Sequence, residues 1–428
     1  MTAPARFVSP VYARLLAGQA ASSLGDAVLT VAAVLWVDRD LAAGRPWAAA
    51  AVSGVPAAAY LAVVLAGPFA GVVVDRHDRR TVMAAAELAR AGLAVALAAV
   101  FFVPAGRLPA GAWLAVLYLA VLGLNGAGQF FAPARTAVIA AMAPGDADRA
   151  RAAGLAEAAA AGAGMIGPLI AVPLMLAGGI GWALLIDAVS YLASWLSVRA
   201  LPPSRPAREG GGLRAELLEG WRAFRGSRHL KALLAVTVTC QLGAGALTAL
   251  NVLAVTGDLH GTARTYGVAE ALMGAGYIAG AAAAGRLVRA AGPRAVVVAG
   301  LSAAAALTAG YAIDRDVPTG LALLAAYAAA IGLLNTAAAP ILMGAVPNGC
   351  LGRVLAVFGP CNQAAGAVSV LGSGWLASGP LRGFSAGDVG PVSLLLLIGA
   401  ALIVAAAACA AAALPSDPHS RKAAVSRR

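Results

Sequence analysis

The chain alternates long apolar stretches with short polar connections. Most of the apolar stretches reach the about 20 residues that an α-helix needs to cross a bilayer. We therefore predict an all-α polytopic membrane protein with about twelve transmembrane helices. Their approximate bounds are 11–37, 47–74, 81–103, 110–131, 152–177, 180–198, 232–255, 266–288, 295–313, 321–346, 354–377 and 392–414.

The longest polar connection divides these helices into two sets of six. It contains Leu201-Pro-Pro-Ser-Arg-Pro and Gly210-Gly-Gly, and then apolar and charged residues alternate at helical spacing over residues 213–224. The second part predicts an amphipathic helix lying at the membrane surface. We accordingly divide the chain into an N-terminal six-helix bundle (1–200), a cytoplasmic linker (201–231), and a C-terminal six-helix bundle with its tail (232–428).

A weak internal repeat supports two pseudo-symmetric halves. Gly71-Val-Val-Val-Asp75-Arg76 follows the second helix, and Gly285-Arg-Leu-Val-Arg289 follows the eighth. The two glycines are 214 residues apart, which is half of the 428-residue chain. Parallel repeats of this kind occur in transporters whose binding site lies where the repeats meet.

Composition supports a lipid environment. The chain is 61% hydrophobic and 12% charged, against about 45–50% and about 25% in soluble domains. The net charge of +12 does not indicate nucleic-acid binding, because the basic residues gather in alternate connections and in the termini. By the positive-inside rule, we expect both termini in the cytoplasm of a bacterial inner-membrane protein. The arginines on the opposite side are Arg39, Arg45, Arg107, Arg264, Arg315 and Arg382.

Catalytic and cofactor chemistry has little support in the sequence. The four cysteines lack metal-ligand spacing, and the four histidines all fall in connections or the tail. No Walker, His-Glu-x-x-His or Gly-x-Ser-x-Gly motif is present. We expect no metal and no cofactor. If the protein carries out active transport, the proton gradient is the simplest energy source. A sensor or scaffold that moves no compound stays open as an alternative of another class.

Ionisable residues inside membrane helices are costly and mark functional sites. Asp26 belongs to a polar stripe on the first helix that also includes Gln19, Ser23 and Thr30. It either exchanges a proton during transport or is permanently hydrogen-bonded. Glu157 on the fifth helix is the second candidate, with pairing to a nearby arginine as the alternative.

Two further groups of polar residues fall within the predicted helices. Glu87 and Arg90 are three residues apart on the third helix, so we expect them to pair in a structural or gating role. The remaining polar residues either line a cavity or make contacts between helices. They are Asn125, Gln129, Gln241, Asn251, Asn335 and Asn362.

The connection between the second and third helices carries the most specific motif, Gly71-Val-Val-Val-Asp75-Arg76-His77-Asp78-Arg79-Arg80. It resembles the Gly-x-x-x-Asp-Arg-x-Gly-Arg-Arg/Lys signature of the major facilitator superfamily, with Asp78 where that family has glycine. We expect Gly71 to permit a close helix approach, and Asp75 to accept hydrogen bonds from a helix N-terminus. The arginines can bridge to acidic groups or lipid phosphate. The resemblance implies a latch between the two halves, and a merely basic turn is the alternative.

The fifth helix carries Gly162-Ala-Gly164-Met-Ile-Gly167-Pro168. The string matches Gly-x-Gly-x-x-Gly, but it lies within an apolar span and not between a strand and a helix, which excludes a dinucleotide site. We expect the glycines to permit close helix packing and Pro168 to permit a bend. The run also resembles a helix-five motif of drug:proton antiporters.

Several segments resemble the third drug:proton antiporter group, which includes macrolide-efflux-like and enterobactin-exporter-like proteins. They are 16–19, 24–26, 75–80, 130–135, 167–168, 185–191 and 219–221. The resemblance implies a monomer that exports a small hydrophobic or amphipathic compound, such as a drug, siderophore or secondary metabolite. Transport would proceed by proton antiport with alternating access. Uptake or facilitated diffusion on the same fold is the nearest alternative.

Overall fold

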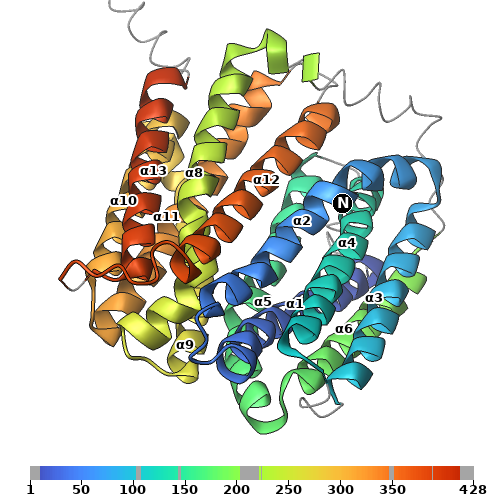
Figure 1. The fold of residues 1–428 in the computed structure, drawn as a ribbon. Coiled ribbons are helices and arrows are strands. Elements are labelled where there is room, and N and C mark those ends of the chain that lie inside the picture. Colours follow the sequence, from blue (N-terminus) through green and yellow to red (C-terminus); the bar gives the residue numbers. More distant parts are fainter. Residues whose placement is uncertain are drawn as a thin grey trace, which may run out of the picture. The chain divides into compact units, whose positions relative to one another are not determined.

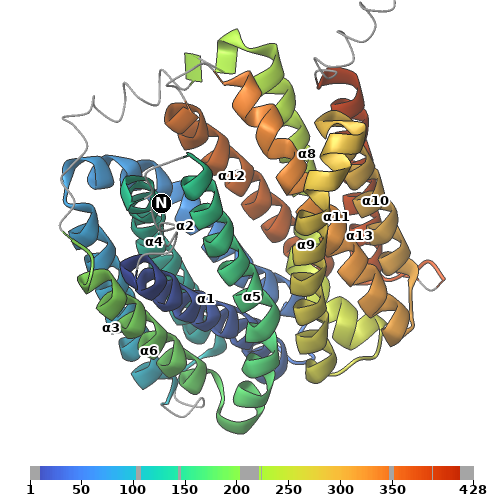
Figure 2. The ribbon, with the colours of Figure 1, turned by 180° about the vertical axis from the view of Figure 1, so that it is seen from behind.

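The computed structural model consists of helices joined by short connections. It describes residues 10–102, 108–142, 146–202, 221–222, 224–346, 351–387 and 389–414. Within these ranges, twelve helices are long and apolar enough to cross a membrane, and Figures 1 and 2 show them from two opposite sides. The predicted fold class is confirmed. Most of the linker expected to form an amphipathic helix lies outside the described residues.

The first compact unit, which we call unit 1, comprises residues 1–43 and 58–213. In it, α1 packs against α5 and α6, while α3 packs against α4 and α6 (Figure 1). A π-helical turn, Val37–Leu41, continues α1. The helices are α1 (Pro10–Trp36), α2 (Ala48–Arg76, apart from its first turns), α3 (Arg79–Phe101), α4 (Ala110–Met142), α5 (Asp146–Gly178) and α6 (Ile180–Arg199).

The second compact unit, unit 2, comprises residues 44–57 and 214–428. Here α8 packs against α12 and α13, and α10 packs against α11 and α13. These four pairings repeat those of unit 1, so the weak sequence repeat corresponds to a repeat of structure. The helices are α8 (Arg228–Leu253), α9 (Ala263–Ala291), α10 (Pro293–Ile313), α11 (Val317–Ala345), α12 (Leu351–Ser378) and α13 (Pro391–Ala413).

The first turns of α2 belong to unit 2, although we predicted that all of α2 lies in the N-terminal bundle. The backbone N–H of Ala50 donates to Ser378 Oγ at 2.8 Å. On α12, Gly374 lies so close to Ser53 that a Cβ there would collide with its side chain. A polar linker shows where the chain leaves one bundle, but it does not show which bundle each helix end packs against.

Two helices extend furthest beyond their predicted bounds. α4 continues through Pro133 to Met142, and α5 already begins at Asp146. Pro133 lies inside α4, since membrane helices tolerate proline where neighbouring groups satisfy the freed carbonyl. The polar first turn of α5 escaped the prediction because hydropathy marks only the apolar part of a helix.

Glycines bring α9 and α11 of unit 2 into backbone contact. A Cβ at Gly276 or Gly280 on α9 would collide with the carbonyl oxygen of Ala325 or Ala329 on α11. Gly332 on α11 lies equally close to the backbone of Tyr277. Such approaches provide van der Waals packing in a bilayer, where apolar burial offers no driving force between helices.

We predict that Gly280→Val destabilises unit 2, because the added methyl groups would push α9 away from α11. Overpacking of this kind costs about 1–3 kcal/mol, which we expect as a lower unfolding temperature of the purified protein. Gly285→Val on the same helix is the control, because the nearest atom to an added Cβ there is Arg289 Nη1, the end of a flexible side chain, at 3.7 Å. Equal unfolding temperatures for the two variants would contradict the packing argument.

Candidate functional site

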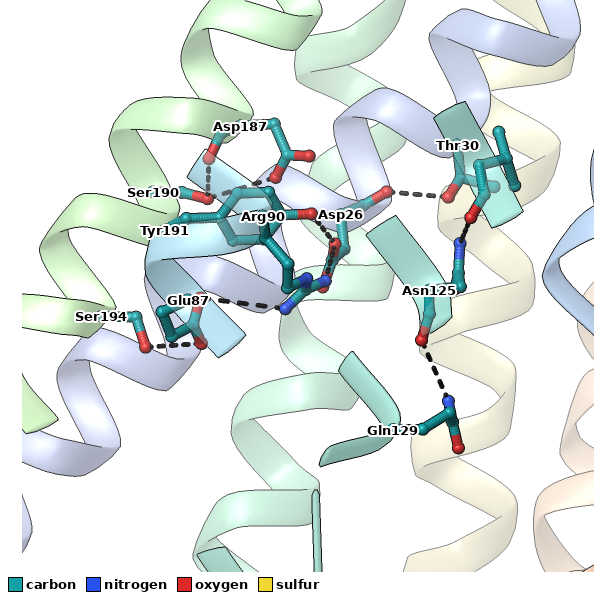
Figure 3. A network of polar contacts seen from close by, with 11 residues as sticks. Asp26, Thr30, Glu87, Arg90, Asn125, Gln129, Asp187, Ser190, Tyr191 and Ser194 are labelled. Carbon is teal, nitrogen blue, oxygen red and sulfur yellow. Dashed lines mark hydrogen bonds and ion pairs between the residues drawn. The ribbon is translucent and has the colours of Figure 1, made fainter. Parts of the chain in front are cut away.

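Charged residues from three helices of unit 1 meet inside the bundle, as Figure 3 shows. Two glycines on α1 allow α6 to approach closely enough for this. A Cβ at Gly18 would collide with Ser197, and one at Gly25 would collide with Ser190 and Asp187. The charge network, as we call this cluster, consists of Asp26 (α1), Glu87 and Arg90 (α3), and Asp187, Ser190, Tyr191 and Ser194 (α6).

Arg90 stands at the centre of the charge network. Its Nη2 lies 2.6 Å from Asp26 Oδ1, and its Nη1 lies 3.9 Å from Glu87 Oε2. The guanidinium carbon also lies 4.0 Å from the centroid of the Tyr191 ring, in cation–π geometry. Arg90 is buried, and it makes both of the ion pairs found among the described residues. Removing Arg90 would leave the buried carboxylate of Glu87 uncompensated in an apolar interior.

Hydroxyl groups of α6 donate to the carboxyl groups. Tyr191 Oη donates to Asp26 Oδ1 at 2.6 Å, and Ser194 Oγ donates to Glu87 Oε1 at 2.9 Å. Ser190 Oγ lies 3.3 Å from Asp187 Oδ1. Within the described residues, Glu87 Oε2 and Asp187 Oδ2 are buried without a hydrogen-bond partner. The charge network therefore contains three carboxyl groups and one guanidinium, which pairs with Asp26 and Glu87.

Asp26 is the open member of the charge network. Its side chain is 43% exposed, whereas that of Arg90 is 9% exposed and that of Glu87 is 1% exposed. Asp187 is also fully buried. A proton or a ligand can therefore reach the buried carboxyl groups through Asp26 with the least rearrangement.

The other residues expected around Asp26 are only partly gathered there. Thr30 Oγ1 donates to the backbone oxygen of Asp26, and Gln19 is buried and accepts from Arg135 Nη1 at 3.3 Å. Ser23 is half-buried on the same helix. On α4, Asn125 and Gln129 donate to backbone oxygens of their own helix.

Two predictions concern pairing. Glu87 and Arg90 do pair, but the closer partner of Arg90 is Asp26, 64 residues away in the sequence. Glu157, the second candidate for proton coupling, is exposed on α5 and is not among the residues of the charge network.

The polar candidates of unit 2 are not gathered into one cluster. Asn251 is buried on α8, where it donates to Glu270 Oε1 at 2.8 Å and accepts from Tyr311 Oη at 3.0 Å. Asn335 and Asn362 instead make separate contacts, with Tyr277 Oη and with the backbone oxygen of Phe358. Gln241 is half-buried on α8.

The turn between α2 and α3 is built differently from what we expected. A Cβ at Gly71 would meet nothing within 4 Å, so the expected close helix approach at this glycine is wrong. Asp78, which stands where the family has glycine, caps α3 by accepting from the N–H of Thr81 at 2.8 Å. Arg80 Nη2 donates to the oxygen of Arg199 at the end of α6.

The remaining members of this turn follow no common pattern. Arg76 is exposed and Arg79 is half-buried, with Arg79 Nε lacking a hydrogen-bond partner among the described residues. The side chain of Asp75 lies outside the described part of the structure, so its expected role stays a prediction.

Only one glycine of the helix-five motif packs closely. A Cβ at Gly167 would collide with Ala27 on α1, whereas Gly162 and Gly164 meet nothing within 4 Å. The expectation of close packing is therefore wrong for the first two glycines. The spacing of small residues shows which positions could approach another helix, but not which face a neighbour occupies. Pro168 is buried within α5.

Of the α6 residues of the charge network, the sequence pointed only to Asp187, as a weaker candidate, and Ser190, Tyr191 and Ser194 were not recognised. Asp187, Ser190, Tyr191 and Ser194 follow one another at spacings of three, one and three, which places them on one face of a helix. That polar face was the available signal. Among the described residues, no group of His, Cys, Asp and Glu side chains could hold a metal ion.

Comparison with known proteins places this geometry in a family. The model of the Major Facilitator Superfamily matches residues 15–253, while no curated protein matches the sequence. Among solved structures, a D-xylose–proton symporter is 15% identical, with a TM-score of 0.72, covering 94% of this chain and 98% of its own.

Two other solved structures share the fold. The nucleoside transporter NupG is 13% identical, with a TM-score of 0.68, covering 96% of this chain and 100% of its own. A bacterial homologue of the human lysosomal transporter Spinster is 14% identical, with a TM-score of 0.65, covering 96% of both chains. These likenesses show the fold alone, and the family match spans more than half of the sequence. The chain is a multi-pass membrane protein and belongs to the Major Facilitator Superfamily.

Proposed function

We propose that this chain is a secondary active transporter that exports a small hydrophobic or amphipathic compound in exchange for protons. The observation that carries the proposal is the charge network of unit 1. Three ionised carboxylates beside one guanidinium would leave excess negative charge in an apolar interior, which is strongly unfavourable. Bound protons balance that charge most directly, and Asp26 opens the network to exchange.

The repeat provides an internal comparison that favours a functional role. Gly243 on α8 packs against α13 as Gly25 packs against α6, so Ala244 stands where Asp26 does. Counted from the first residues of α3 and α10, Leu301 and Ala304 stand where Glu87 and Arg90 do. Both are buried and apolar. The fold packs without these charges in unit 2, so packing alone does not explain them in unit 1.

The direction of transport and its coupling to protons are supported by other observations than the charge network. The helix-five sequence and the segments that resemble drug:proton antiporters favour export by alternating access. The solved relatives include a proton symporter and a nucleoside transporter, which makes uptake the rival to be tested. The compound itself would be a drug, siderophore or secondary metabolite.

We predict that an exported compound dissipates the proton gradient of inverted membrane vesicles that contain the wild-type protein. Asp26→Asn is expected to abolish this response, because asparagine cannot exchange a proton. Glu157→Gln is the matched control, since it removes an exposed carboxylate outside the charge network. The measurement is the fluorescence of a pH-sensitive dye as antibiotics, dyes and siderophores are added in turn.

Two results would count against the proposal. If Asp26→Asn responds like wild type, the charge network is not the coupling site. If a radiolabelled compound crosses the membrane without any change in the proton gradient, the protein is a facilitator and not an antiporter. Each variant is compared at equal expression and with the same elution profile in size-exclusion chromatography.

A stability measurement separates the structural part of the network from its proton chemistry. We predict that Arg90→Gln lowers the free energy of unfolding by about 3–5 kcal/mol, the usual cost of removing one partner of a buried pair. Asp26→Asn should cost much less, because its side chain is 43% exposed. Thermal unfolding of the purified variants tests this order, and equal unfolding temperatures would show that Arg90 is not the structural centre.

A further inference from the structure

An apolar groove of about 420 Å³ lies within unit 1, and no residue of the charge network lines it. It begins where α2 ends and α3 begins, and it runs along α3 and α4 (α2, α3 and α4 are labelled in Figure 1). Apart from His77 and Thr81, its lining is entirely hydrophobic. The lining residues are Val73, His77, Thr81, Val82, Ala85, Ala86, Ala89, Ala127 and Phe130.

Small side chains contribute to the groove. Ala85 and Ala89 are one turn apart on α3, and both are exposed. Between α2 and α4, a Cβ at Gly126 would reach only the Cβ of Ala66, at 3.9 Å. In unit 2, by contrast, Gly280 brings the repeat partners α9 and α11 into backbone contact.

The length of the groove matches one leaflet of a bilayer. On α3 the lining runs from Thr81 to Ala89, which lies eight residues further along, or about 12 Å of helix. The hydrocarbon core of a membrane is about 30 Å thick. The groove therefore extends from the level where α2 ends and α3 begins to about the middle of the hydrocarbon.

The mouth of the groove carries positive charge. Arg76 and His77 are exposed at the end of α2, and Arg79 follows at the start of α3. Over residues 75–80, three arginines against two aspartates leave a net positive charge, and Asp78 accepts hydrogen bonds from the N–H and Oγ1 of Thr81. Arginines at a membrane surface attract anionic lipids, at about 1 kcal/mol each.

We infer that the groove binds one acyl chain of an anionic phospholipid whose phosphate lies against Arg76 and His77. A transported drug is a poorer fit, because ligand pockets hold a few polar groups that orient the ligand. Here the polar groups lie only at the mouth, where a headgroup lies. This site is independent of the direction and coupling of transport.

The groove is tested by filling it. Ala85→Leu/Ala89→Leu places two larger side chains in the groove, and Ala96→Leu/Ala99→Leu makes the same change at exposed positions of α3 outside it. Both proteins are reconstituted in vesicles of equal parts phosphatidylglycerol and phosphatidylcholine, extracted in detergent and washed. Mass spectrometry then counts the phospholipid that each protein retains.

We expect wild type and the Ala96→Leu/Ala99→Leu control to retain phosphatidylglycerol, and the groove-filled protein to lose it. Equal retention by all three proteins would overturn the inference. A second result would also overturn it. If the Ala85→Leu/Ala89→Leu protein retains lipid but no longer responds to a compound in the vesicle assay, the groove belongs to the transported molecule. The unfolding temperature of each variant checks that it is folded.

The headgroup contact has its own test. Arg76→Gln should lower the ratio of retained phosphatidylglycerol to phosphatidylcholine about fivefold, which corresponds to about 1 kcal/mol. Arg289→Gln is the control, because Arg289 is the exposed arginine at the equivalent end of α9. An unchanged ratio in Arg76→Gln, or an equal fall in Arg289→Gln, would rule out a specific phosphate contact at this groove.

Discussion

The packing of unit 1 depends on the burial of one guanidinium. Arg90 lies on α3, its closest anionic partner lies on α1, and the aromatic ring over it lies on α6. These helices are far apart in the sequence, so the charge can be compensated only when the bundle is assembled. Gly18 and Gly25 of α1 are needed for the same burial, because a larger residue at either position would push α6 away. Arg90 would then be separated from Tyr191 and Asp26.

Unit 2 shows what the same fold looks like without this requirement. Its helices pair in the same way, but the corresponding positions are apolar, and its buried polar contacts gather around Asn251, Glu270 and Tyr311. The close approach of α1 with α6 is repeated by α8 with α13, and unit 2 adds a second one, of α9 with α11. A repeated fold thus carries two different polar arrangements. Among the described residues, only the arrangement of unit 1 includes ion pairs with a buried cation, and this difference is what supports the proposal of proton coupling in unit 1.

The sequence was informative where a property is local. The number of spans and the costly charge of Asp26 follow from the hydropathy of each segment, and the repeat follows from short motifs that recur along the chain. The partner of Arg90 does not, because a spacing of three points to Glu87, whereas the tertiary fold brings Asp26 closer. Gly71, Gly162 and Gly164 show the same limit: a glycine permits an approach, but the neighbour must come from elsewhere in the fold. Pro133 likewise interrupts the hydrogen-bond pattern of α4 without ending the helix.

The groove and the charge network share two helices, one residue apart on each. On α3, Ala89 lines the groove and Arg90 carries the buried charge. On α4, Ala127 lines the groove, and an added Cβ at the next residue, Gly128, would lie 3.6 Å from Arg90 Cζ. Helices are stiff over one turn, so an occupant that presses α3 and α4 apart acts directly on the walls that hold the guanidinium. A bound lipid would therefore bear on the geometry around Asp26 without touching it.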